Sequence, residues 1–224
     1  MIIAIDGPAG TGKSTVAKMI AVRLDFTYLD TGAMYRAVTY RALETGTRLD
    51  DAEALTRLAQ SEPISFAPGG TVLISGEDVT AQIRTPEVDA NVSTVSAVPG
   101  VRQALTEQQR AFAASNDVVM EGRDIGTVVF PHAEVKVFLT ASAEERAARR
   151  ASQNAQRGSG STDPAVILEQ IQERDRIDST RATAPLKAAD DATVVDTTSL
   201  SIDQVVDAIA SLASERGARD PQKA

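Results

Sequence analysis

Cysteine is absent from the 224-residue chain. A disulfide-bonded scaffold, a thiolate metal site and a cysteine nucleophile are therefore excluded, and we expect a protein of the reducing cytoplasm. The chain also lacks any apolar run that approaches the roughly 18 residues needed to cross a bilayer, so we expect no membrane partner. Its opening residues, Met-Ile-Ile-Ala-Ile, are too few for the apolar part of a signal peptide and have no basic residue before them, so we expect no targeting segment.

Positive charge is in deficit, since 23 Lys and Arg residues stand against 31 Asp and Glu residues and the formal net charge is -8. Proteins that bind DNA, RNA or anionic membranes need a basic surface, so we expect no nucleic-acid polymer as a partner. Of the basic residues 18 are arginines, a bias that suits phosphate partners but that GC-rich codon usage would also produce. With 42% hydrophobic residues the chain can bury a core, and its length fits one domain or one core with an inserted lobe.

Short apolar strands alternate with helical patterns along most of the chain. We expect strands at residues 2–6, 27–30, 118–120, 135–139 and 193–195, with helices between them that include 13–24, 33–45, 143–156 and 164–181. This alternation predicts an α/β fold, a parallel sheet with helices on both faces. Residues 61–84 differ, because short β segments separated by glycine turns indicate a small inserted β lobe. Residues 214–224 read as a polar tail.

A glycine-rich loop follows the first predicted strand. Residues 7–14 match G-x-x-x-x-G-K-[ST] in full, between a strand and a helix as that motif requires. The glycines let backbone N–H groups close around phosphate oxygens, and the helix N-terminus adds a favourable dipole. Lys13 would reach the β and γ phosphates and the Ser14 hydroxyl would ligate Mg²⁺, whereas a plain glycine turn with a helix cap is the structural alternative. We predict a nucleoside triphosphate site formed by Gly7, Pro8, Ala9, Gly10, Thr11, Gly12, Lys13, Ser14 and Thr15.

Phosphoryl transfer needs positioning and positive charge more than a covalent nucleophile, together with a second phosphate site and a lid that excludes water. Arg36 and the pair Arg123-Asp124 follow predicted strands, at the sheet edge where open α/β folds bind ligands. A helix and the flexible stretch after it supply the lid candidates Arg146, Arg149, Arg150 and Arg157. The next helix places on one face Arg174, Asp178 and Arg181.

Four blocks of the sequence resemble the bacterial cytidylate kinases. They are residues 5–15 (IDGPAGTGKST), 29–36 (LDTGAMYR), 121–131 (EGRDIGTVVFP) and 173–186, which begins ERDRIDSTR and ends APL. The first block alone indicates only a P-loop nucleoside triphosphatase, whereas the four in order are specific, and the resemblance continues to about residue 209. It implies transfer of the γ-phosphoryl group of ATP to CMP or dCMP with Mg²⁺, giving ADP and CDP or dCDP.

The resemblance also implies the architecture. A P-loop kinase fold with a five-stranded parallel sheet would use about residues 1–45, 100–150 and 165–224 as its core. About residues 46–99 would form an inserted monophosphate-binding lobe, and about residues 151–164 a short lid. A monomer is compatible with this arrangement.

Site roles follow from the same resemblance. The acceptor phosphate would be held by Thr31, Arg36 and Arg123. The cytosine edge would be read by Ser93, Arg102 and Asp124. The sugar and the phosphate region would meet Arg174, Asp178 and Arg181. The migrating phosphoryl group would be stabilised by Lys13, Arg123, Arg146, Arg150 and Arg157.

The assignment to cytosine has a chemical basis. A carboxylate such as Asp124 accepts a hydrogen bond from the cytosine N4 amine, while Arg102 donates to O2 and N3; uracil has a carbonyl at position 4 and should be disfavoured. Thr31 stands where many relatives carry serine, and its hydroxyl preserves the site. Glu121 stands where many relatives carry aspartate, and its role stays open. Asp6 could be a structural cap of the phosphate loop or a metal ligand.

The charged clusters also have structural interpretations. The arginines at 146–150 could form a solvated helix face in which Glu145 pairs with Arg149, and the charges at 173–178 could be surface ion pairs. Asp124 could simply pair with Arg123 or a neighbouring loop.

Rival functions remain at this point. One is another P-loop kinase that acts on UMP, AMP or a non-nucleotide acceptor. The other is a nucleotide-dependent switch, but a GTPase of that kind needs an Asn-Lys-x-Asp segment to read guanine, and none occurs here. The one histidine, His132, we interpret as a surface loop residue, because phosphoryl transfer needs no imidazole.

Overall fold

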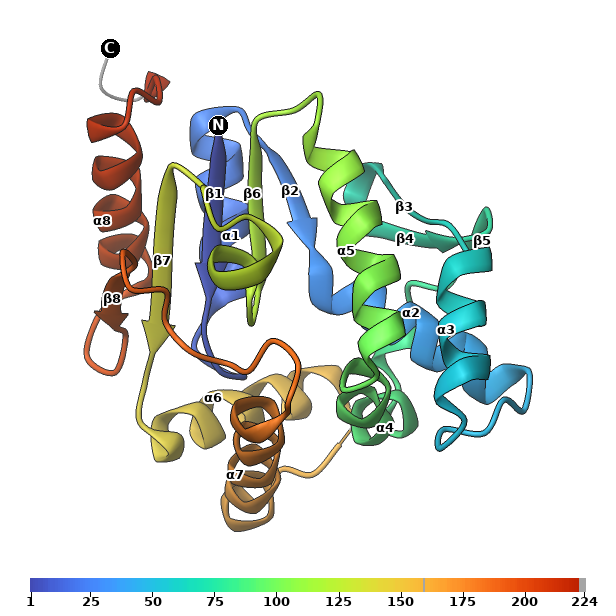
Figure 1. Cartoon of the computed structure of the whole chain (residues 1–224). Coiled ribbons are helices and arrows are strands. Elements are labelled where there is room, and N and C mark those ends of the chain that lie inside the picture. Colours follow the sequence, from blue (N-terminus) through green and yellow to red (C-terminus); the bar gives the residue numbers. More distant parts are fainter. Residues whose placement is uncertain (159, 222–224) are drawn as a thin grey trace. The chain divides into compact units, whose positions relative to one another are not determined.

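The computed structural model describes residues 1–158 and 160–221, without the side chain of Arg157 (Figure 1). Two compact units are distinguished by their internal contacts, unit 1 (Met1–Asp30 with Ala113–Ala224) and unit 2 (Thr31–Phe112). Unit 1 contains the elements β1 (Ile2–Asp6), α1 (Lys13–Leu24), β2 (Thr27–Asp30), β6 (Val118–Gly122), η3 (Ile125–Val129), β7 (Val135–Thr140), α6 (Ala143–Arg157), α7 (Pro164–Thr180), β8 (Thr193–Asp196) and α8 (Ile202–Glu215). Unit 2 contains α2 (Thr31–Glu44), α3 (Ala52–Ser61), β3 (Ile64–Ala67), η1 (Pro68–Gly70), β4 (Thr71–Ile74), β5 (Glu77–Asp78), η2 (Gln82–Arg84), α4 (Pro86–Ser96) and, apart from its last residue, α5 (Pro99–Ala113).

Unit 1 is built around a five-stranded parallel sheet in the order β2-β6-β1-β7-β8. The predicted α/β fold and the five-stranded core implied by the resemblance are therefore confirmed. β1 lies in the middle, and Ile3 and Ile5 are fully buried, as expected for a strand covered on both faces. Glu121 of β6 lies opposite Ile5 of β1 and Asp30 of β2, so the carboxyl ends of these three strands share one edge.

Helices flank this sheet. α1 and α8 pack against β1, β6 and β7 through apolar residues that include Val16 and Ile20 of α1 and Val206 and Ile209 of α8. These pairs recur every three to four residues, which gives each helix one apolar face. Figure 1 shows the short helix η3 in front of the sheet and α1 behind it, with α6 and α7 beyond the carboxyl ends of the strands. No helix of the described residues combines the length and the apolar character that a membrane span needs.

Unit 2 contains a small antiparallel sheet of β3, β4 and β5. Val72 and Val79 of this region pack with Ala33 and Ala37 of α2 in a separate apolar core. The short β segments predicted for residues 61–84 are thus present. The third strand, β5, ends at Asp78, and the N–H of the buried Val79 that follows it donates to the Val72 carbonyl at 3.0 Å.

Two local predictions differ from the structure. α2 begins at Thr31 and not at residue 33, because Gly32 falls in the first helical turn, where the backbone N–H groups have no intrahelical partner in any case. The predicted polar tail from residue 214 is wrong in part. α8 continues to Glu215, and Asp220 is buried and accepts a hydrogen bond from Arg23 Nη2 at 2.9 Å.

The N-terminus of α8 offers a test of local stability. Ser201 accepts a hydrogen bond from the N–H of Gln204, and the Gln204 side chain accepts one from the N–H of Ser201. Replacing Ser201 with alanine leaves an N–H without its acceptor, so we expect the free energy of unfolding to fall by about 1 kcal/mol. Urea unfolding followed by circular dichroism measures this change. Ser201→Thr, which keeps the oxygen, is the control, and equal losses in both variants would contradict the prediction.

Candidate active site

The phosphate loop between β1 and α1 needs glycine for steric reasons. Gly7 and Gly10 have φ angles of 145° and 82°, which side-chain-bearing residues rarely adopt. A Cβ atom on Gly7 would lie 2.1 Å from the Leu139 carbonyl oxygen, and one on Gly10 would lie 3.0 Å from Cβ of Arg146. The loop is therefore fitted closely against β7 on one side and α6 on the other.

Lys13, the first residue of α1, carries a buried ammonium group beside this loop. The residue is 6% exposed, and its Nζ donates a hydrogen bond to the Pro8 carbonyl oxygen at 2.6 Å. Burial and the nearby cations Arg123 and Arg174 lower the pKa of Lys13 to about 7, while Glu121 acts in the opposite direction. Two arginines predicted to serve the acceptor therefore lie within electrostatic reach of the phosphate-loop lysine.

Glu121 is a site residue whose role the sequence left open. It is buried near the end of β6 and accepts hydrogen bonds from the hydroxyls of Ser14 and Tyr28. Burial and the neighbouring carboxylate of Asp30 raise its pKa, against the opposing effect of Lys13. Sequence reasoning missed the contact with Ser14 because it depends on β6 being the strand beside β1.

Asp6, the last residue of β1, anchors the turn that follows β6. Its two carboxylate oxygens accept hydrogen bonds from the backbone N–H groups of Ile125 and Gly126, at 2.9 and 2.7 Å. Burial raises the pKa of Asp6 to about 6, although these hydrogen bonds act to lower it. Asp6 therefore has a structural role, but the backbone that it caps is the turn after β6 and not the phosphate loop, as the sequence had suggested.

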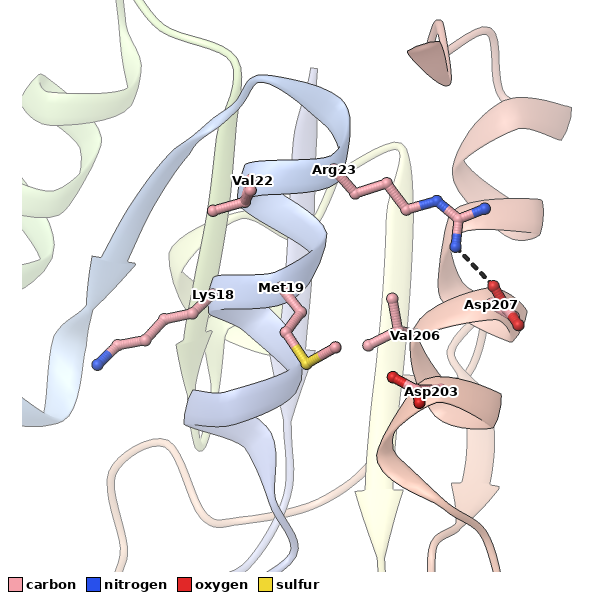
Figure 2. Close-up of a pocket in the computed structure, with 7 residues that line it drawn as sticks. All are labelled: Lys18, Met19, Val22, Arg23, Asp203, Val206 and Asp207. Carbon is pink, nitrogen blue, oxygen red and sulfur yellow. Dashed lines mark hydrogen bonds and ion pairs between the residues drawn. The ribbon is translucent and has the colours of Figure 1, made fainter. Parts of the chain in front are cut away.

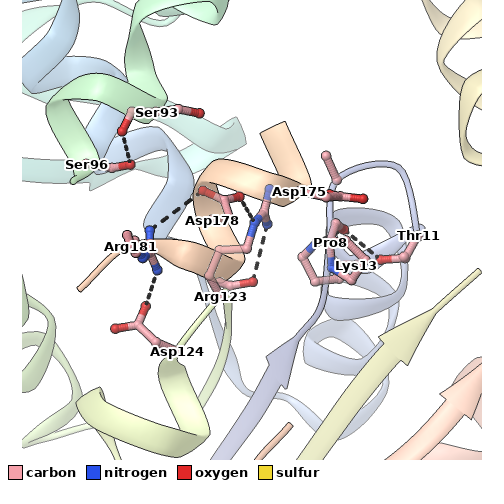
Figure 3. Close-up of polar contacts among 12 residues, drawn as sticks. Pro8, Thr11, Lys13, Ser93, Ser96, Arg123, Asp124, Asp175, Asp178 and Arg181 are labelled. Carbon is pink, nitrogen blue, oxygen red and sulfur yellow. Dashed lines mark hydrogen bonds and ion pairs between the residues drawn. The ribbon is translucent and has the colours of Figure 1, made fainter. Parts of the chain in front are cut away.

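Four residues predicted to bind substrate form one cluster in unit 1 (Figure 3). Arg123 Nε donates to Asp178 Oδ2 of α7 at 2.9 Å. Arg181 lies 3.7 Å from the Asp178 carboxylate and 3.8 Å from that of Asp124. Burial by itself would raise the pKa of Asp178, but the positive charges of Arg123 and Arg174 outweigh it and hold that pKa below its ordinary value. The carboxylate of α7 thus joins arginines from two segments, and the roles of these residues toward substrate stay predictions.

The charged residues of α7 were also given a structural interpretation, as exposed ion pairs, and this is right for some of them only. On α7, Glu173 and Arg176 form an exposed ion pair at 2.7 Å, as the surface interpretation expects. Asp178 is buried, so that interpretation fails for it. Asp124 lies 3.8 Å from Arg181, the residue that follows α7, so its carboxylate faces a neighbouring segment.

The arginines of α6 differ in what they contact. Arg149 pairs with Glu145 at 2.9 Å, as the structural interpretation expects, but it is only partly exposed and also donates to the hydroxyl and carbonyl of Thr197, so it does not lie on a solvated face. Arg146 is buried against the phosphate loop, and Arg150, partly buried, follows it one turn later. Arg157 ends the helix, and its side chain lies outside the described residues.

Unit 2 holds the remaining residues predicted for the acceptor phosphate. Thr31 and Arg36 are buried on α2. The Arg36 guanidinium forms an ion pair with Asp89 of α4 and donates to the Ile83 carbonyl at 3.4 Å. The arginine is thereby held from two neighbouring elements of its own unit.

Unit 2 also holds two of the predicted base-reading residues, on α4 and α5. Arg102 is 4% exposed, its guanidinium carbon lies 5.2 Å from the centre of the Tyr35 ring, and Nη1 donates to the Ser96 carbonyl at 3.0 Å. The Ser96 hydroxyl donates in turn to the Ser93 carbonyl (Figure 3). Tyr35 was missed because the ring contact joins two helices that are distant in the sequence.

A groove of about 500 Å³ between α1 and α8 lies apart from these residues (Figure 2). It is lined by Lys18, Met19, Val22, Arg23, Asp203, Val206 and Asp207. None of the predicted site residues lines it. We therefore place the candidate active site at the carboxyl edge of the sheet, around the phosphate loop.

A parallel sheet that leads into a glycine loop with a buried lysine, and then into a helix, defines a P-loop nucleotide-binding protein. The arginines gathered near that lysine are what phosphoryl transfer within this class requires. Comparison with known proteins narrows the class. The family model described as cytidylate kinase matches residues 3–215, and the chain belongs to this family.

Individual relatives agree with the family. The chain is 53% identical over 214 residues to the cytidylate kinase of Listeria monocytogenes serovar 1/2a, which covers 94% of this chain and 95% of that protein. It is 54% identical over 217 residues to the cytidylate kinase of Geobacillus sp. (strain WCH70), with 96% of each chain covered. An uncharacterized protein from Eubacterium ventriosum has a related fold, with a TM-score of 0.51 at 12% identity over 96% of this chain and 98% of that one. The resemblance of the four sequence blocks is thereby confirmed.

The buried carboxylate of Asp6 makes stability depend on pH. Because burial raises the pKa of Asp6 in the folded protein, its contribution to stability is full below about pH 4 and is lost as pH rises through about 6. Asp6→Asn removes this titration. Relative to the variant, wild type should therefore lose about 2.5 kcal/mol of unfolding free energy between pH 4 and pH 7.

Urea unfolding of both proteins across this pH range measures the difference. Asp203→Asn, an exposed change on α8, is the control and should leave the pH profile of wild type unchanged. A difference between wild type and Asp6→Asn that does not vary with pH would contradict the raised pKa.

Proposed function

We propose that the protein transfers the γ-phosphoryl group of ATP to CMP or dCMP, giving ADP and CDP or dCDP. One observation carries this proposal beyond family membership. Arg123 and Arg174, from the segments predicted to hold the acceptor, lie near enough to Lys13 of the phosphate loop to lower its pKa. Charges proposed for the donor and for the acceptor would thus act on each other within unit 1, which supports direct transfer between two bound nucleotides.

The donor phosphates would be bound by the loop from Gly7 to Thr15. Backbone N–H groups of the loop would surround the phosphate oxygens, and Lys13 would meet the β and γ phosphates. The growing charge on the migrating phosphoryl group would be offset by Arg123, Arg146, Arg150 and Arg157. In this proposal the protein supplies orientation and charge, and no side chain acts as a nucleophile.

Magnesium fits the residues beside the loop. The Ser14 hydroxyl donates to the buried Glu121 carboxylate, so two oxygen ligands of the kind that Mg²⁺ prefers lie together. No group of three or more acidic or histidine residues that could hold a metal occurs among the described residues. Mg²⁺ usually completes its shell with water and substrate phosphates, so Ser14 as ligand and Glu121 beside it suffice. The bound ion would neutralise charge on the phosphates.

The acceptor nucleotide would be held by the residues that the resemblance assigns to it. Its phosphate would contact Thr31, Arg36 and Arg123. Its base would be read by Asp124, which accepts from the cytosine N4 amine, and by Ser93 and Arg102. Its sugar and phosphate region would meet Arg174, Asp178 and Arg181. The buried pairing of Asp178 with Arg123 supports this assignment, because it fixes an arginine without consuming all five of its donors.

The proposal also covers the lobe, the lid, the oligomeric state and the location of the protein. Residues 46–99 would act as the monophosphate-binding lobe, and residues 151–164 would form a lid that excludes water during transfer. One chain supplies every residue named, so a monomer would suffice. We propose a cytoplasmic location, where ATP and cytidylates are both available.

Replacing Lys13 with methionine should separate catalysis from folding. Because burial disfavours the charged amine, an apolar chain of similar length should be tolerated, and the free energy of unfolding should not fall. Loss of the cation should lower kcat/KM for CMP by about 100-fold or more. A coupled assay of ADP release measures the rate, and Lys18→Met, an exposed change on the same helix, is the control. Turnover of Lys13→Met at the wild-type rate would contradict the proposed mechanism.

The acceptor is tested with a panel of CMP, dCMP, UMP, AMP and GMP in the same assay. CMP and dCMP should be used best, and equal rates for all five, or no rate above ATP alone, would refute a cytidylate kinase. Asp124→Asn should reduce kcat/KM for CMP by about tenfold to 100-fold while KM for ATP stays unchanged, because Asp124 is assigned to the base of the acceptor and not to the donor. An equal loss with UMP would show that Asp124 does not read the base.

A further inference from the structure

Arg146 of α6 is held by oxygen atoms from three parts of unit 1. Its Nε donates to the Ala141 carbonyl and its Nη1 to the Ala9 carbonyl, each at 3.1 Å. The same Nη1 lies 2.7 Å from Oδ2 of Asp175 on α7. Arg146 is 6% exposed, so its charge has to be balanced within the protein. A single nitrogen therefore joins the phosphate loop to α7.

Asp175 is the carboxylate that balances this charge. Its side chain is 24% exposed, and its second oxygen, Oδ1, is buried without a hydrogen-bond partner among the described residues. Figure 3 shows Asp175 on α7 next to the loop residues Pro8 and Thr11. The ion pair with Arg146 is thus the contact that orients this side chain.

The hydrogen bond to Ala9 also controls the next backbone donor of the loop. The Ala9 carbonyl and the Gly10 N–H belong to one planar trans peptide group and point in opposite directions. When Arg146 holds the Ala9 carbonyl, it therefore also fixes the direction of the Gly10 N–H, one of the backbone donors of the loop. The backbone of the loop also packs closely against α6 here, since a Cβ added to Gly10 would lie 3.0 Å from that of Arg146.

On α7, Asp175 is flanked by residues that are proposed to bind the acceptor nucleotide. Arg174 precedes it, and Asp178, which holds Arg123, follows one helical turn later. Arg123 and Arg174 are also the cations that lower the pKa of Lys13. The ion pair therefore connects the loop to the helix that carries Arg174 and that holds Arg123 through Asp178.

We propose that Asp175 is a positioning residue for the phosphoryl donor. It fixes Arg146, which fixes the Ala9–Gly10 peptide and directs the Gly10 N–H toward the donor phosphates, and it ties this loop to α7. The inference rests on the proposed function only in taking the phosphate loop as the ATP site.

The first test is ADP binding to the full chain without any acceptor, measured by calorimetry. Asp175→Ala should weaken ADP about tenfold, and Asp175→Asn, which keeps one acceptor oxygen, should weaken it less. Glu173→Ala removes an exposed carboxylate from the same helix and should change the dissociation constant less than twofold. Unchanged ADP binding in Asp175→Ala would overturn the proposal. Tighter binding would also overturn it, and would identify the carboxylate as a charge that repels the phosphates.

A double-mutant cycle with Arg146→Met decides whether Asp175 acts through that arginine. In the Arg146→Met background, Asp175→Ala should cause no further loss of ADP affinity, whereas multiplying losses would overturn the proposal. The comparison of the double variant with Arg146→Met can be made even if Asp175→Ala alone fails to fold, because the double variant leaves no buried cation unpaired. Turnover with CMP, measured in parallel, tests the proposed function separately, since ADP affinity does not depend on the acceptor.

Discussion

The buried ammonium group of Lys13 is the charge around which unit 1 is arranged. A cation so deep in the protein is costly unless acceptors and counter-charges surround it, and here the Pro8 carbonyl and the Glu121 carboxylate do so. Arg123 and Arg174 act against the same charge, which leaves Lys13 ready to gain stabilisation from an anion. Phosphate is such an anion, and its arrival would relieve the repulsion among the three cations. The charge of the lysine therefore explains why the carboxylates Glu121 of β6 and Asp178 of α7 lie close to the arginines around it.

The buried guanidinium groups of unit 2 also need partners within the protein. Arg36 is paired with Asp89, and Arg102 rests on the Tyr35 ring with one nitrogen on the Ser96 carbonyl. Each contact restricts a long side chain whose rotamer freedom would otherwise have to be lost when a ligand binds. The residues predicted to recognise the acceptor are thus oriented within their own unit, by neighbours that carry no predicted role toward substrate.

Features encoded in neighbouring residues were predictable from the sequence, and features that depend on packing were not. The loop and α1 follow from a local pattern of glycines and helical spacing, and the strands of the sheet from short apolar runs, so these predictions are confirmed. Glu121 and Asp175 gained their partners only once β6 lay beside β1 and α6 lay against α7. The five-residue helix η3 escaped notice because it is too short to show a period. The role of Asp6 could not be predicted either, because its partners are backbone N–H groups more than a hundred residues away in the sequence.

Asp6 also has a consequence for how such a site can evolve. Its carboxylate precedes the phosphate loop directly, and it holds the backbone immediately after Asp124, the residue assigned to the base. The phosphate loop and the turn after Asp124, the residue proposed to read the base, are therefore held together by one carboxylate. A mutational path toward another nucleobase that reshapes the Asp124 turn would disturb ATP handling as a side effect, whereas changes confined to side chains of unit 2 would not. Altered base preference should accordingly be reached more easily through α4 and α5 than through the turn after β6.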